Sequence, residues 1–123
     1  EHSLKEAIER MIGEFSSVSD LTIALDYEPG DVDLEKTKED ILFRIIQESI
    51  TNALRHGHAT EVHIQVYQED HFLYLKIQDN GIGCDDVHYG FGLTQMRERL
   101  AVINGQVEFD GSHGFLTVAK IPI

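Results

Sequence analysis

RIIQESITNALRHG, residues 44–57, is the stretch from which the predicted fold of this chain follows. Apolar side chains recur in it, and in the residues just before it, at the spacing of a helix with one buried face. They are Ile41, Leu42, Ile45, Ile46, Ile50, Ala53 and Leu54. Glu48, Asn52 and His56 follow in steps of four, so they form a polar stripe on the same helix. We expect this stripe to hold Mg²⁺ and nucleotide phosphates; a solvated polar face is the alternative.

Composition and charge narrow the class of protein. The chain has 123 residues, of which 41% are hydrophobic and 26% charged, as in an ordinary globular domain. The single cysteine, Cys84, excludes an internal disulfide, so we expect a cytoplasmic domain and leave membrane anchoring of its parent protein open. A net charge of −12 argues against nucleic acid as a partner. Binding of a polyanion would therefore need a local device, such as a metal ion or a helix N-terminus.

The apolar periods predict three helices and five strands in one domain. We expect a helix at 3–15, a strand at 21–27, the long helix, strands around 62–66 and 73–77, a helix at 93–103, and strands around 107–109 and 117–121. Asp33 or Thr37 is expected to cap the long helix, and Gly57 to follow its end. Because strands come in hairpins and helices come singly, the predicted fold class is α/β. We expect a two-layer sandwich with a mixed, mostly antiparallel five-stranded sheet and three helices on one face.

A second candidate site segment is Asp79-Asn80-Gly81-Ile82-Gly83, directly after a predicted strand. A rigid sheet can aim a side chain at a strand end, and the Asp79 carboxylate can accept from an exocyclic amine such as that of adenine. Gly81 and Gly83 would let the backbone approach a flat ring. A plain turn is the alternative. A calcium loop is excluded, because the alternating acidic ligands and the closing Glu are absent.

The third segment, Gly90-Phe91-Gly92-Leu93, opens the predicted helix at 93–103. Glycines before a helix N-terminus present free N–H groups and the positive end of the helix dipole to an anion. The segment lacks the Gly-Lys-Ser/Thr of a Walker A loop. By itself it also fits a simple loop–helix junction.

Together and in this order, the three segments resemble the nucleotide-binding domain of the GHKL superfamily, which includes gyrase, Hsp90, MutL and histidine kinases. QESITNALRH is similar to its N box, DNGIG to its G1 box and GFGL to its G2 box. The sensor histidine kinases that pair with NarL-type response regulators are the most similar group. The similarity to them lies in RIIQESITNALRHGHAT, the short segment between the glycine boxes, and GLTQMRERLAVINGQV. The resemblance extends from Leu4 to Pro122 and implies the Bergerat α/β sandwich.

The resemblance also implies roles for individual residues. Asn52 would coordinate Mg²⁺, and Glu48 would act as general base or as the partner of a metal-bound water. The other implied ATP-binding residues are Arg55 and His56 near the phosphates, Asp79 at the adenine amine, Gly81 and Gly83 beside the base, and Gly90, Gly92 and Leu93 in the lid over the phosphates.

The last predicted strand departs from the pattern of this group. Members usually carry Gly-Thr at its start, with the Thr near adenine, whereas this chain has Gly114-Phe115. We assign the second adenine contact to Thr117, further along the strand. A second departure is Gln95, which stands where the group usually has a small residue.

By this resemblance the chain would bind Mg-ATP and donate the γ-phosphate to a histidine. None of its seven histidines lies in a segment that could form a two-helix dimerisation domain. We therefore expect residues 1–123 to be the single ATP-binding catalytic domain, a C-terminal fragment of a longer sensor kinase. The expected partners are an upstream dimerisation and phosphoacceptor domain and a NarL-type response regulator, with a monomeric isolated domain and a homodimeric parent. The alternatives are an anti-sigma-type serine kinase of the same superfamily and a non-enzymatic interaction domain that has lost ATP.

Overall fold

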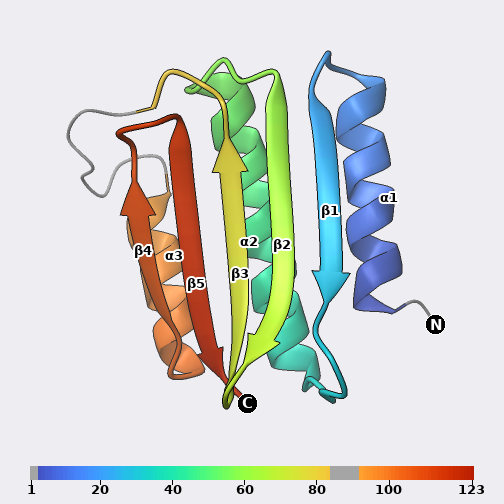
Figure 1. The fold of residues 1–123 in the computed structure, drawn as a ribbon, viewed down its shortest axis with the longest axis vertical. Helices are drawn as coiled ribbons and strands as arrows, with labels where there is room; N and C mark the ends of the chain where they lie inside the picture. The colour runs from blue at the N-terminus through green and yellow to red at the C-terminus, as the bar shows by residue number, and fades with distance from the viewer. Residues whose placement is uncertain (1–2, 84–91) are drawn as a thin grey trace.

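The computed structural model describes residues 3–83 and 92–123. Within them, the elements are α1 (Leu4–Ser17), β1 (Thr22–Glu28), α2 (Lys36–Arg55), β2 (Glu61–Glu69), β3 (Phe72–Asp79), α3 (Leu93–Val102), β4 (Gln106–Asp110) and β5 (Phe115–Pro122). The strands form one sheet in the order β1-β2-β3-β5-β4, with the helices on one face (Figure 1). Strand β1 is parallel to β2 and the other pairs are antiparallel. The predicted two-layer α/β sandwich is thus confirmed.

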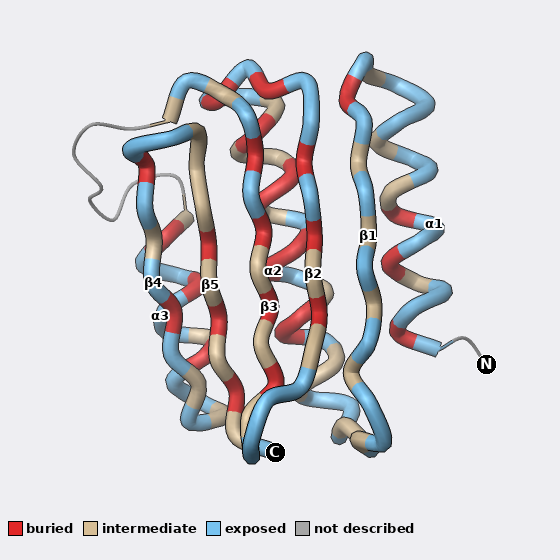
Figure 2. The backbone as a smooth tube through the Cα atoms, in the orientation of Figure 1, coloured by how far each residue is buried: buried red, intermediate tan, exposed pale blue. Residues whose placement is uncertain are grey.

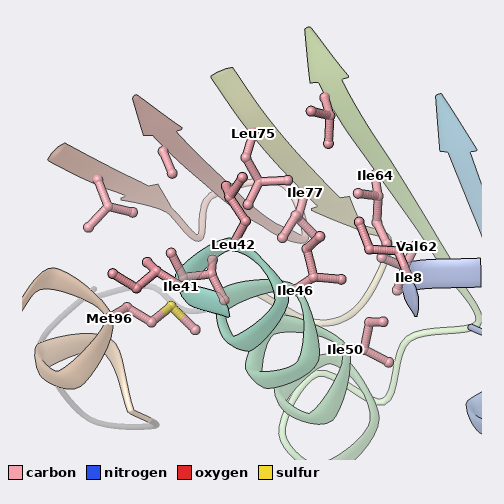
Figure 3. Close-up of a cluster of buried hydrophobic side chains, with 14 of the residues drawn as sticks. Ile8, Ile41, Leu42, Ile46, Ile50, Val62, Ile64, Leu75, Ile77 and Met96 are labelled. Atoms are coloured by element: carbon pink, nitrogen blue, oxygen red, sulfur yellow. The ribbon is translucent and has the colours of Figure 1, made fainter. Parts of the chain in front are cut away.

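The core lies between the sheet and the helices, with α2 at its centre. Helix α2 turns its apolar face toward β2 and β3, as the helical spacing predicts (Figure 3). Ile45, Ile46 and Ile50 are fully buried, and Ile64 and Leu75 are equally buried on the sheet side. Buried residues concentrate on the central strands, whereas β1 has none (Figure 2). The core therefore fixes α2 rigidly against the strands whose ends carry the candidate site residues.

The two ends of α2 differ from each other in how they are stabilised. The predicted cap by Asp33 or Thr37 was wrong, because the N-cap residue is Glu35 and its side chain makes no capping hydrogen bond. Thr37 lies inside the first turn, where its own backbone is already helical. At the other end, Gly57 follows the C-cap residue as predicted, and its N–H donates to the carbonyl of Asn52 over 3.0 Å. The left-handed residue that redirects the chain is His58, with φ 50°.

Candidate functional site

A cavity opens at the end of the sheet where β3 finishes and β5 begins, the upper end in Figure 1. The cavity has a volume of about 160 Å³ and is partly open to solvent. Its lining comes from the C-terminal end of α2, the segment after β3, the start of α3 and the start of β5. The lining residues are Asn52, His56, Gly57, Asp79, Ile82, Gly83, Leu93 and Phe115. The fold thus brings together parts of all three segments that the sequence singled out.

Asp79 is the last residue of β3 and is only 7% exposed. Its Oδ1 accepts two backbone hydrogen bonds, from Gly81 N–H over 2.9 Å and from Phe115 N–H over 3.1 Å. Burial raises the pKa of this carboxyl above its ordinary value, and the two N–H donors partly offset that effect. Its Oδ2 receives no hydrogen bond from residues 3–83 or 92–123. One oxygen therefore holds the side chain in place, and the other remains available to a ligand that carries a donor.

The segment after Asp79 is attached to the loop that follows α2. Asn80 Oδ1 accepts from the N–H groups of Thr60 and Glu61, each over 2.9 Å, and its Nδ2 donates to Thr60 Oγ1. The Ile82 N–H donates to the carbonyl of Gly57 over 2.8 Å. These bonds connect the DNGIG segment directly to the C-terminal end of α2, so both border the same cavity.

Gly81 and Gly83 are needed where they stand because other backbone segments lie against them. A Cβ at Gly81 would overlap the carbonyl of Gly57, and one at Gly83 would overlap the carbonyls of Gly111 and Gly114. Gly83 also has a φ of 71°, a left-handed conformation that favours glycine. The DNGIG segment can therefore approach both the α2 end and the turn before β5; Gly83 lines the cavity and Gly81 is outside the lining.

The polar stripe of α2 runs along one side of this region. Asn52 and His56 line the cavity. One turn earlier, Glu48 Oε1 accepts from Nη1 of Arg99 on α3. Glu48 Oε2 is buried and has no hydrogen-bond partner within the described part of the chain. It faces the start of α3, since a Cβ at Gly92 would lie 3.6 Å from it.

The predicted site residues thus fall into groups. Asn52, His56, Asp79, Gly83 and Leu93 line the cavity. Glu48 and Gly92 lie beside each other, and both of them and Gly81 are outside the lining. Arg55 is exposed in the last turn of α2, outside the lining. Thr117 is 2% exposed and also outside the lining, and Gly90 falls outside the described residues.

Four residues of this region were not among the predicted site residues: Gly57, Ile82, Phe115 and Arg99. Gly57 ends the motif RIIQESITNALRHG and Ile82 lies within DNGIG. Their position next to predicted site residues could therefore have identified them. Phe115 was visible as a departure from the usual Gly-Thr pair. No sequence signal pointed to the pairing of Arg99 with Glu48, because the two lie 51 residues apart.

The donor set suits a magnesium ion that is mainly held by a bound nucleotide. Residues 3–83 and 92–123 hold no cluster of three or more His, Cys, Asp or Glu side chains that could hold a metal. They do hold the unpartnered Glu48 Oε2 and, one helical turn away, the amide of Asn52 at the cavity. Mg²⁺ commonly takes one or two protein oxygens, keeps several waters and binds substrate phosphates. The residues present therefore fit this ion.

Residues 37–123 match the family described as histidine kinase-, DNA gyrase B-, and HSP90-like ATPase. The chain belongs to this family. It is 32% identical over 123 residues to the signal transduction histidine-protein kinase/phosphatase UhpB of Salmonella typhimurium, covering 98% of this chain and 25% of that protein. It is 40% identical over 100 residues to the sensor protein VraS of Staphylococcus saprophyticus, covering 79% of this chain and 28% of that protein. The chain thus spans about a quarter of the length of these relatives.

Solved structures of histidine kinases share the fold of this ATPase-family domain. The ATP-binding domain of PrrB from Mycobacterium tuberculosis superposes with a TM-score of 0.78 at 21% identity, covering 98% of this chain and 94% of that one. The Acinetobacter baumannii histidine kinase AdeS also gives 0.78, at 19% identity, covering 97% and 62%. The predicted resemblance to the catalytic ATPase domain of sensor histidine kinases is confirmed, and that class of enzyme is a transferase. No helix in the described ranges is long and apolar enough to cross a membrane.

Proposed function

We propose that this domain binds Mg-ATP in the cavity and donates the γ-phosphate to a histidine of a dimerisation domain in two-component signalling. The observation that carries the proposal is the Asp79 carboxylate, fixed through Oδ1 and available through Oδ2 at the wall of the cavity. Adenine has an exocyclic amine that can donate to such an oxygen. Membership of an ATPase family and similarity to sensor kinases support the same ligand.

The base would lie at the strand ends, and the phosphates toward α2 and α3. The cavity wall at the strand ends combines one carboxylate with the apolar Ile82 and Phe115, which suits a flat ring with one donor group. At the other side, the first N–H groups of α3 follow Gly92, whose φ of 82° turns the chain into the helix. A helix N-terminus binds phosphate oxygens without any positive side chain. An acidic chain needs a local phosphate-binding group of this kind in order to bind a polyanion.

We assign the remaining predicted residues to the phosphates and to the metal. His56 lines the cavity, and Arg55 is its neighbour at the end of α2, so both would approach phosphate oxygens. Gly90 stays a prediction for the lid over the phosphates. Asn52, and a water next to Glu48 Oε2, would hold Mg²⁺. When bound, this ion offsets the negative charge of the phosphate oxygens.

The chemistry would be transfer of the γ-phosphoryl group to an imidazole nitrogen. A nitrogen–phosphorus bond forms, the bond from phosphorus to the ADP oxygen breaks, and ADP leaves with the electron pair. Glu48 would accept the proton that the imidazole releases, and its hydrogen bond from Arg99 orients the carboxylate for that role. Imidazole is already a good nucleophile, so the domain's own contribution is positioning and charge stabilisation.

The phosphoacceptor would lie on an upstream dimerisation domain of the same protein, and a NarL-type response regulator would receive the phosphate. We propose a cytoplasmic, monomeric domain that forms the C-terminal part of a homodimeric sensor kinase. The span of about a quarter of each relative supports an additional domain elsewhere in the protein. The relatives are sensor kinases, which favours this function over the serine-kinase alternative.

The test is isothermal titration of the domain with Mg-ATP, using Asp79→Asn as the variant. Asparagine keeps an oxygen that accepts from Gly81 and Phe115, so the fold should persist while the charged acceptor for the amine is lost. We expect Asp79→Asn to weaken binding at least about tenfold, which corresponds to about 1.4 kcal/mol. Asp31→Asn, in the exposed loop before α2, is the matched control and should bind normally. A wild-type domain that binds no Mg-ATP would overturn the proposal.

A further inference from the structure

Phe115 is the first residue of β5 and lies beside Asp79, the last residue of β3. The two residues are direct partners in the β3–β5 ladder, and Phe115 N–H donates to Asp79 Oδ1 over 3.1 Å. Phe115 is one of the residues that line the cavity. Thr117, the next residue of β5 on the same face, is 2% exposed and does not line it. The wall beside Asp79 is therefore aromatic.

The Phe115 ring packs near a second aromatic ring. Its centroid lies 5.9 Å from that of Phe109 on β4, with the two planes tilted by 34°. The guanidinium of Arg97 on α3 lies 6.0 Å from the centre of the Phe109 ring. This arrangement gives Phe115 a second ring to pack on, so it presents a fixed apolar surface to the cavity.

The chemical consequence concerns the edge of adenine. That edge presents a donor, the 6-amine, next to an acceptor, ring nitrogen N1. Asp79 can accept from the amine, but a phenyl ring cannot donate to N1. The backbone N–H groups of Gly81 and Phe115 already donate to Asp79 Oδ1. Among the described residues, these two N–H groups are therefore engaged by Asp79 and are not free to donate to N1.

We propose that Phe115 determines the base specificity of this site. Its ring binds the purine ring by apolar contact and makes no hydrogen bond to N1. One hydrogen bond, from the base to Asp79, then selects the nucleotide. This inference rests on the proposed ATP site and adds which atoms of the base are recognised. The ligand class is a purine nucleoside triphosphate with an N–H donor facing Asp79. Replacing N1 by C–H should cost nothing, whereas removing the 6-amine should weaken binding.

The experiment is titration of the chain with the Mg²⁺ complexes of ATP, 1-deaza-ATP and purine riboside triphosphate, which lacks the amine. In the wild type we expect ATP and 1-deaza-ATP to bind within about twofold, and the amine-free nucleotide at least about fivefold more weakly, the size of one hydrogen bond. The Phe115→Thr variant should bind 1-deaza-ATP about fivefold more weakly than ATP, because the threonine hydroxyl can donate to N1 of ATP and 1-deaza-ATP lacks that nitrogen. Phe115→Leu should weaken all three nucleotides by about fivefold or more through lost ring contact, without changing their ratios.

Leu116→Thr is the matched control, since it makes a similar change one residue along β5 on the opposite face of the sheet. It should leave the three affinities and their ratios unchanged. A wild type that binds 1-deaza-ATP at least fivefold more weakly than ATP overturns the inference, and so does Phe115→Leu with unchanged affinity. If Asp79→Asn abolishes ATP binding while the Phe115 variants behave like wild type, only this inference fails. If the wild type binds no ATP, the proposed function fails with it.

Discussion

Arg99 on α3 donates from Nη1 to Glu48 Oε1 on α2, joining two residues that are 51 positions apart in the chain. Both side chains are mostly covered, with 30% of Arg99 and 24% of Glu48 exposed. The second oxygen of Glu48 is buried without a partner in the described residues. Arg99 is therefore the charged group that compensates the Glu48 carboxylate, and it links the last turn of α3 to the polar stripe of α2.

Arg99→Met should destabilise the domain by about 1–3 kcal/mol, because it leaves a partly buried carboxylate without its charged donor. The double variant Glu48→Gln with Arg99→Met should lose less than the sum of the two single losses, since no lone charge then remains. Urea denaturation of the four proteins measures both quantities. Arg44→Met, at an exposed position of α2, is the control and should change stability by less than about 0.5 kcal/mol. Equal losses in Arg99→Met and Arg44→Met would contradict this account.

The periodic parts of this fold could be predicted from the sequence alone. The spacing of Ile45, Ile46 and Ile50 identifies the buried face of α2, and that face necessarily places Asn52 and His56 on a neighbouring stripe. Alternation in β3 likewise leads to Asp79 at the strand end. These are local properties with a period set by backbone geometry.

The remaining features depend on how distant segments meet, which local patterns do not encode. Gly81 looked like a residue that admits a ligand, yet its missing side chain is explained by the carbonyl of Gly57 behind it. Strand register places Phe115 opposite Asp79 and Thr117 opposite Ile77, a pairing that no local pattern in the sequence showed. The absent cap at Glu35 shows the same limit at a helix start, where several polar residues compete.

The raised pKa of Asp79 gives a pH dependence of stability that Asp79→Asn should remove. Burial makes the folded state bind the proton more tightly than the unfolded chain does. The contribution of Asp79 to folding is therefore most favourable at low pH. It falls as the pH rises from the ordinary aspartate value through the raised folded value, and is constant above that. The stability of Asp79→Asn relative to wild type should thus increase across this window.

Urea unfolding of both proteins at a series of pH values measures this difference. Subtracting the two curves removes the contributions of the other carboxylates, which are numerous in a chain of net charge −12. A flat difference curve for Asp79→Asn would mean that burial does not disfavour its charged form.

Asn52→Ala should reduce the affinity for Mg-ATP about tenfold, or by about 1.4 kcal/mol, because a hard oxygen donor at the cavity is lost. Removal of Mg²⁺ with a chelator should weaken ATP binding to the wild type by a similar factor. It should have little further effect on Asn52→Ala, since the two changes remove one interaction. Titrations with and without the metal give the four affinities.

The control for the Asn52 titrations is Gln47→Ala, at an exposed position of the same helix outside the cavity lining. It should keep the full dependence on Mg²⁺. If Asn52→Ala also kept that dependence, Asn52 would not be a metal ligand.

Two glycine substitutions should have opposite effects on stability. Gly13 lies at an exposed position of α1, and a Cβ added there would meet no other group within 4 Å, so Gly13→Ala should stabilise the domain by about 0.5–1 kcal/mol through helix propensity. Gly81→Ala would drive its Cβ into the backbone carbonyl of Gly57 and should destabilise by about 1–3 kcal/mol. The clash also displaces the Gly81 N–H from Asp79 Oδ1, so ATP affinity should fall in Gly81→Ala alone. Thermal unfolding of both variants measures their stability, and ATP titration measures their affinity. An undiminished ATP affinity in Gly81→Ala would show that the Gly81 N–H does not position the Asp79 carboxylate.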